Sequence, residues 1–435
     1  MASDAALGDV AQLTMGQSPP GSTYNTDGEG LPFFQGVADF GTRHPTARVY
    51  CTAPTRVADS GDILFSVRAP IGRVNIANTK CATGRGLAIL RPRDPRDARY
   101  IEFVLRSLEA SWSRLEGGGS VFGNATKKDL ETLAIPWPEP MERQAIGEVL
   151  AGLDDKVELN RRMARTLEEM ARALFKSWFV DFDPVRAKAE GRDPGLPKHL
   201  ADPFPDRLVD SELGEIPRGW DLKTLGDVVS ELEVGGRPKG GVAGYATGVP
   251  SIGAESVLGL GRFDYSKTKY VPRTFFDQMK KGHIRNGDVI LYKDGGKPGQ
   301  FEPHVSMFGG GFPFGECAIN EHVYRVRVDD IGQEFLYLWL SSDLLLEEMR
   351  RKGTGVAIPG LNSTQVRSLT VLMPSDEVAA AFRELVAPMV GGVLVAAVEQ
   401  RRLAEVRDAL LSKLISGAVR IPDPEGLLAR LETVA

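Results

Sequence analysis

The residues best suited to chemistry lie in two glycine- and lysine-rich loops. One holds Gly117, Gly118, Gly119, Ser120, Asn124, Thr126, Lys127 and Lys128, and the other holds Arg351, Lys352, Gly353, Thr354, Asn362 and Ser363. Glycine lets backbone approach a ligand closely, lysine and arginine neutralise phosphate, and asparagine and threonine can bond to base edges. The pattern favours binding of a nucleic acid, and the alternative is a flexible surface loop that ends in a helix cap.

Further basic residues could contribute to the same binding. They are Arg43, His44, Arg48, Arg68, Arg73 and Arg85 in the first part of the chain, and Arg237, Lys239, Lys293, Lys297 and His304 in the second. Arginine is the commonest bidentate reader of guanine, whereas lysine mostly meets phosphate. For any one of them, the alternative is a solvated surface charge.

Signatures of catalysis are absent from the sequence. Gly295-Gly296-Lys297-Pro298-Gly299 lacks the Ser or Thr of a phosphate-binding loop. Ser18-Pro19-Pro20-Gly21 resembles the catalytic loop of amino-methyltransferases superficially, but it has neither the amide or acid nor the aromatic residue that the reaction needs. Three cysteines and five histidines are too scattered for a zinc site. We therefore expect no catalytic residue, no metal site and no cofactor bound by this chain.

Composition is that of a globular protein in a reducing compartment. The chain has 435 residues, a formal charge of −5 and 42% hydrophobic residues, which excludes a polycationic DNA coater. The N-terminus lacks the pattern of a signal peptide, and the most apolar window, 386–398, is interrupted by Pro388 and is too short to span a bilayer. We expect a cytoplasmic location.

Three short segments recur in the same order, which predicts a duplicated unit. Residues 7–10 match 225–228, residues 61–65 match 287–291, and residues 129–138 match 365–374. The offsets of 218, 226 and 236 residues grow along the chain, as expected if the second copy has longer loops. Within the copies, 62–67 and 289–292 predict strands, and 99–115 and 334–351 predict amphipathic helices.

A long helix follows each copy. Apolar residues at alternating spacings of three and four run from Ile146 to Trp178 and from Phe382 to Leu414, which is typical of coiled-coil packing. An amide interrupts each run, Asn160 in the first and Gln400 in the second. Pro388 and the glycines after it predict a kink or a late start of the second helix. The predicted blocks are 1–138, helix 139–180, a linker at 181–212, block 213–375, helix 376–417 and a tail at 418–435.

Three stretches carry a family resemblance, namely residues 18–36, residues 211–220 (Ser-Glu-Leu-Gly-Glu-Ile-Pro-Arg-Gly-Trp) and residues 411–417. Through them the chain resembles the specificity subunits of type I restriction–modification systems over nearly its whole length. Residues 18–36 resemble the opening of many first target-recognition domains, and residues 211–220 resemble the entry to a second. Residues 411–417 resemble the end of a second spacer helix. One departure is that the first domain lacks an Ile-Pro-x-Gly-Trp equivalent and starts directly at residues 7–9.

This resemblance implies an α+β fold with two homologous mixed α/β target-recognition domains, 1–138 and 213–375. Two long antiparallel coiled-coil helices would join them with pseudo-twofold symmetry. Each domain would read one half of a split, asymmetric site in double-stranded DNA. Two methyltransferase (modification) subunits, with or without motor–nuclease (restriction) subunits, would dock on the chain and bring S-adenosylmethionine, ATP and Mg²⁺.

Other readings stay open at this point. The chain could serve a methylation-only or related anti-phage system, since that distinction lies in the partners. A self-contained nuclease or methyltransferase is less consistent with the missing catalytic motifs. A coiled-coil scaffold that binds only proteins is less consistent with the duplicated loop-rich blocks.

Overall fold

The computed structural model describes residues 3–112, 124–212, 214–295, 299–353 and 359–434. The chain divides into two compact units, and each is described by itself. Unit 1 comprises Met1–Lys156 and Leu403–Ala435, and unit 2 comprises Val157–Arg402. Helices α5 (Pro140–Phe179) and α13 (Asp376–Ile415) each contribute residues to both units.

Unit 1 is built on a four-stranded antiparallel sheet of order β2-β10-β7-β8. A second sheet of order β3-β5-β4-β9-β6 and the pair β1-β11 complete it. Strand bounds are β1 Ser3–Ala6, β2 Ala11–Met15, β3 Tyr24–Asn25, β4 Leu31–Phe34, β5 Tyr50–Cys51, β6 Val57–Ala58, β7 Ile63–Ser66, β8 Val74–Ile76, β9 Cys81–Thr83, β10 Leu87–Pro92 and β11 Ala134–Trp137. Helix bounds are α1 Leu7–Val10, α2 Ala98–Ser107, α4 Lys127–Glu131 and α14 Pro424–Val434.

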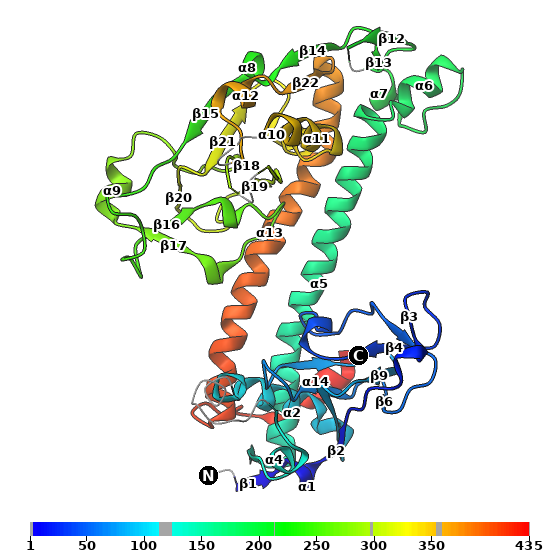
Figure 1. Cartoon of the computed structure of the whole chain (residues 1–435), viewed down its shortest axis with the longest axis vertical. Helices are drawn as coiled ribbons and strands as arrows, with labels where there is room; N and C mark the ends of the chain where they lie inside the picture. The colour runs from blue at the N-terminus through cyan, green and yellow to red at the C-terminus, as the bar shows by residue number, and fades with distance from the viewer. Residues whose placement is uncertain (1–2, 113–123, 213, 296–298, 354–358, 435) are drawn as a thin grey trace. The chain divides into compact units, whose positions relative to one another are not determined.

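Unit 2 repeats this plan with the sheet β15-β21-β18-β19 (Figure 1). The sheet β17-β16-β20 and the pairs β14-β22 and β12-β13 accompany it. Strand bounds are β12 Leu208–Ser211, β13 Gly214–Pro217, β14 Asp221–Thr224, β15 Val229–Val234, β16 Val249–Ile252, β17 Lys269–Val271, β18 Val289–Tyr292, β19 Val305–Met307, β20 Ala318–Ile319, β21 Val323–Val328 and β22 Thr370–Met373. Helix bounds are α6 Asp183–Ala189, α7 Lys198–Ala201, α8 Leu225–Val228, α9 Arg273–Gln278, α10 Gln333–Leu340, α11 Asp343–Lys352 and α12 Ser363–Arg367.

The two central sheets also share a carboxylate at the same turn. Asp62 precedes β7 and Asp288 precedes β18, and each accepts a backbone N–H from the residue three positions earlier. A guanidinium from the neighbouring strand bonds each carboxylate, Arg91 in unit 1 at 2.8 Å and Arg327 in unit 2. The Gly-Asp turn and the arginine of the neighbouring strand that bonds it recur in both units. The matching segments of the sequence have therefore folded into matching structures.

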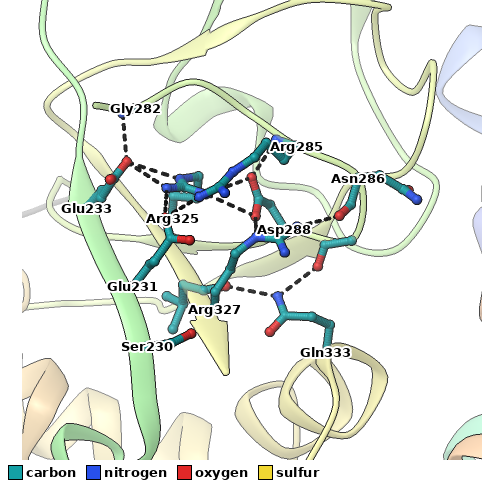
Figure 2. Close-up of polar contacts among 12 residues, drawn as sticks. Ser230, Glu231, Glu233, Gly282, Arg285, Asn286, Asp288, Arg325, Arg327 and Gln333 are labelled. Carbon is teal, nitrogen blue, oxygen red and sulfur yellow. Dashed lines mark hydrogen bonds and ion pairs between the residues drawn. The ribbon is translucent and has the colours of Figure 1, made fainter. Parts of the chain in front are cut away.

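Unit 2 extends this pair into a buried ionic network (Figure 2). Arg325, with a side chain 2% exposed, lies between Glu233 at 2.8 Å and Asp288 at 3.3 Å, and it also contacts Glu231. Burial disfavours the charge on Arg325, but these three carboxylates outweigh that cost and raise its pKa. A buried charge is stable only with such partners, so the network binds β15, β18 and β21 into one register.

Helices α5 and α13 run antiparallel within each unit. In unit 1, Arg407 of α13 pairs with Asp154 of α5. In unit 2, the buried Asn160 amide of α5 donates to Glu399 of α13 at 2.8 Å, and Phe175 packs on Phe382 with ring centroids 6.1 Å apart. The amide in the α5 seam therefore meets a carboxylate across the seam, which fixes the register of the two helices.

The core of unit 2 explains the hydropathy of α13. An 18-residue window of this helix has a mean hydropathy of 1.7. By length and composition alone, the helix could therefore cross a membrane. The expectation that no such window exists was too narrow, since only residues 386–398 were considered. Val378, Phe382, Val386, Val390 and Val393 of α13 are all buried among the other apolar side chains of unit 2. Their packing is that of a core helix.

The structure refines three local expectations. Helix α13 begins at Asp376 and continues through Pro388, so of the kink or late start expected there the late start is absent. The helix expected over 334–351 is two helices, because Ser342 caps α11 by accepting the N–H of Leu345. The stretch 181–212, expected as a linker, contains α6, α7 and β12, and its Phe204 packs on Trp178 in the core of unit 2.

Candidate nucleic-acid interface

Two loops meet beside the central sheet of unit 1. Arg68, just after β7, forms an isolated bridge with Asn124, which precedes α4. The N–H of Ala125 donates to the carbonyl of Val67 at 2.8 Å. The structure therefore brings together Arg68 and Asn124, two residues that the sequence predicted to contact DNA.

Unit 2 joins the equivalent loops in the same way. Asp294, just after β18, forms an isolated bridge with Gly360, which precedes α12. The N–H of Leu361 donates to the carbonyl of Lys293 at 2.7 Å. Because the two backbones match while Arg68 is replaced by Asp294, the units present the same frame with different side chains.

The polar residues at these junctions also cap short helices. Thr126 accepts the N–H of Asp129 at 3.3 Å and caps α4. Asn362 accepts the N–H of Gln365 at 2.9 Å and caps α12, whose first residue is the exposed Ser363. The side chains of Thr126 and Asn362 are thus already hydrogen-bonded, as the alternative reading of these loops expected.

Most other predicted residues of unit 1 have partners within the unit. Arg43 pairs with Asp155, Arg48 with Asp39 at 2.6 Å and Arg73 with Glu109 at 2.7 Å, and His44 contacts the Ile76 carbonyl at 2.9 Å. Lys127 pairs with Glu131 at 3.2 Å but stays half-exposed, and Lys128 is exposed. Arg43 is largely buried, so its contact with Asp155 stabilises the fold, whereas the lysines face solvent.

Unit 2 shows a similar division. Lys352 donates to the Ser368 carbonyl and hydroxyl at 2.7 and 2.8 Å, so its ammonium is held by the fold. Lys293 donates to the Glu321 carbonyl at 3.0 Å. Exposed cations are Arg237, Lys239 and Arg351. The predicted residues Ser120, Lys297 and Thr354 lie outside the described part of the chain.

Sequence reasoning missed an acidic hub in unit 1. Burial disfavours the charge on Asp154, but Arg106 and Arg407 lie against it and lower its pKa. Asp154 and Asp155 together pair with four arginines from three segments: Arg43; Arg99 and Arg106 of α2; and Arg407 of α13. No local pattern reveals such a hub, because its partners meet only after folding.

The described residues include potential metal ligands and nucleophilic cysteine side chains. Among them, no group of three or more His, Cys, Asp or Glu side chains is placed to hold a metal ion. The cysteines are buried and free, and burial raises the pKa of the Cys81 and Cys317 thiols to about 12, which keeps both protonated and unreactive. The site is a set of polar and basic loops suited to binding.

Comparison with known proteins agrees with this geometry. Residues 4–169 match the family model described as the type I restriction modification DNA specificity domain. The chain is 24% identical over 425 residues to the type I restriction enzyme MjaIX specificity subunit of Methanocaldococcus jannaschii, covering 95% of this chain and 93% of that protein. It is 43% identical over 158 residues to a protein assigned as the MjaX specificity subunit of the same organism, covering 36% of this chain and 37% of that protein.

A solved structure shares the fold. The type I restriction–modification S subunit from M. genitalium aligns with a TM-score of 0.57 and 16% identity, covering 95% of this chain and 96% of that one. The shared fold agrees with the family model and the relatives. The chain is therefore similar over nearly its whole length to type I restriction–modification specificity subunits, and residues 4–169 match their DNA specificity domain.

Proposed function

We propose that the chain recognises double-stranded DNA as two half-sites, one read by each unit. The observation that carries this is the equivalence of the two central sheets and of the loop junctions beside them. Equivalent backbones with different side chains suit two related readers of two different sequences. The recognised site is then split and asymmetric, and the base pairs between its halves are not read.

We propose that α5 and α13 set the distance between the half-sites. A 40-residue helix is about 60 Å long, and one turn of DNA is about 34 Å. Each helix contributes residues to both units, and the hydrogen bond between Asn160 and Glu399 fixes the register of α5 against α13. The two units would act as target-recognition domains, and the helices as the spacer.

We further propose that catalysis belongs to partner subunits. Two modification subunits would bind the chain and transfer a methyl group from S-adenosylmethionine to adenine N6 in each half-site. Motor–nuclease subunits would add restriction where the host encodes them. A methylation-only or related anti-phage system would use the chain in the same way.

A genome-wide map of N6-methyladenine, in the host with and without this gene, tests the proposal. We expect a split, asymmetric motif that disappears on deletion and returns when the gene is restored. Methyl transfer by the purified chain alone would support a self-contained enzyme instead. Failure to bind DNA with the natural partners present would support a protein-binding scaffold.

A further inference from the structure

In each unit, the loop that follows the first strand of the central sheet (β2 or β15) meets the loop that precedes the neighbouring strand (β10 or β21). Met15 at the end of β2 pairs with Ala88 of β10, and Val234 at the end of β15 pairs with Tyr324 of β21. These registers make the residues that follow β2 and β15 equivalent, and also those that precede β10 and β21. Gly16-Gln17-Ser18-Pro19 therefore corresponds to Gly235-Gly236-Arg237-Pro238, and Arg85 corresponds to Glu321.

The same two positions touch each other in each unit. In unit 1, the N–H of Arg85 donates to the hydroxyl of Ser18 at 3.3 Å. In unit 2, Nε of Arg237 lies 2.8 Å from Oε1 of Glu321. Corresponding positions therefore touch in both units, although Ser18 corresponds to Arg237 and Arg85 corresponds to Glu321.

The two loops are packed tightly enough to present these side chains from a fixed place. A Cβ at Gly16 would lie 2.2 Å from the carbonyl oxygen of Gly84, and one at Gly235 would lie 1.7 Å from that of Ile319. Both distances are far below any tolerated contact, so the loops approach each other through backbone. A side chain on either loop is therefore held close to the other loop.

Each unit places a guanidinium at this junction, from opposite loops. Unit 1 carries it on the second loop as the exposed Arg85. Unit 2 carries it on the first loop as Arg237, whose side chain is 60% exposed. Glu321 occupies the position of Arg85, is 27% exposed, and also lies 3.5 Å from Nε2 of His322. The Glu321 carboxylate forms an ion pair with the inner nitrogen of Arg237, while most of the Arg237 side chain faces solvent.

We propose that Arg85 and Arg237 are the base-reading residues of this junction in the two units, each directed at a guanine in one half-site. Glu321 is a positioning residue that orients Arg237. Guanine presents O6 and N7 as two acceptors in the major groove, which match the paired donors of a guanidinium. This inference rests on the proposed function and adds the residue and the base of one contact in each half-site.

The test is the methylation motif of the full chain expressed with its natural partner subunits in a host without adenine methylation. We expect Arg85→Ala to lose selectivity at one guanine position in one half-site, by roughly 5- to 150-fold, as for one bidentate contact. Arg237→Ala should do the same at one position in the other half-site. Glu321→Gln should relax the position affected by Arg237→Ala, and the double variant should match Arg237→Ala alone.

Arg96→Ala and Arg273→Ala are matched controls. Both are exposed arginines, paired with Asp94 in unit 1 and with Asp277 and Glu316 in unit 2. They should leave the motif unchanged, and all variants should unfold at the wild-type temperature.

The outcomes separate this inference from the proposed function. A wild-type chain that yields no split motif overturns the proposed function and this inference with it. A wild-type split motif that both arginine variants leave unaltered overturns the inference alone. Equal weakening at all sequences would assign these arginines to phosphate, which also overturns base reading. Changes confined to one half-site would overturn the equivalence of the units.

Discussion

A matched insertion of seven residues in each long helix tests whether α5 and α13 set the spacing between half-sites. The insertion points are after Lys156 in α5 and after Arg402 in α13, where the chain passes from one unit to the other. The Asp154–Arg407 pair lies on one side of these points, and the Asn160–Glu399 bond lies on the other. Both contacts can therefore be retained.

The expected change follows from helix geometry. Seven residues add about 10 Å at about 1.5 Å per residue, and they rotate the ends by only about 20° because a heptad is close to two turns. At about 3.4 Å per base pair, the unread part of the DNA site should lengthen by about 3 base pairs. The bases of both half-sites should stay the same, because neither sheet nor loop junction is altered.

The assay is sequencing of methylated adenines in cells that express the variant with the modification subunits. An insertion in α5 alone is the control. It displaces one of the two helix contacts by a heptad and should lower the unfolding temperature. A motif with the original spacing in the doubly extended protein would refute the role of the helices, as would altered half-site bases.

Three further changes test other parts of the structure. Asp288→Asn should lower the free energy of unfolding by about 3 kcal/mol in urea titrations, because it breaks a buried ion pair while Arg325 keeps its glutamate partners. The control Asp330→Asn, at an exposed position, should lower it by under about 0.5 kcal/mol. Equal losses in the two variants would contradict the role of the ionic network. Because the pKa of Asp154 is lowered, its contribution to stability is present above about pH 4 and is lost as pH falls through the lowered pKa. Circular dichroism of Asp154→Asn between about pH 5 and 2 should therefore show a weaker acid dependence than wild type, and an identical profile would dismiss the pair. Lys127→Ala should weaken DNA binding and reduce the slope of log affinity against log salt by about one, whereas an unchanged slope would remove Lys127 from the phosphate contacts.

Much of the fold was predictable because its patterns are local. The apolar periodicity from Ile146 to Trp178 indicated one long helix, and the structure has α5 over Pro140–Phe179. The strand expected at 289–292 is β18. The match of residues 61–65 with 287–291 indicated a duplicated element, and Asp62 and Asp288 do accept matching backbone hydrogen bonds. Such features depend on residues a few positions apart, so the sequence displays them directly.

The assignment of individual binding residues needed the tertiary structure. Lys352 and Arg237 looked alike as exposed cations, but the fold binds Lys352 to Ser368 and presents Arg237 on Glu321. The correspondence of Ser18 with Arg237 was also hidden, because nothing in the residue types relates them. It emerges from strand register, which sets where distant loops meet. The sequence by itself determined the repeated elements and the resemblance to specificity subunits. The long-range pairing of strands decided which side chains face solvent at the junctions, because that register brings those distant loops together.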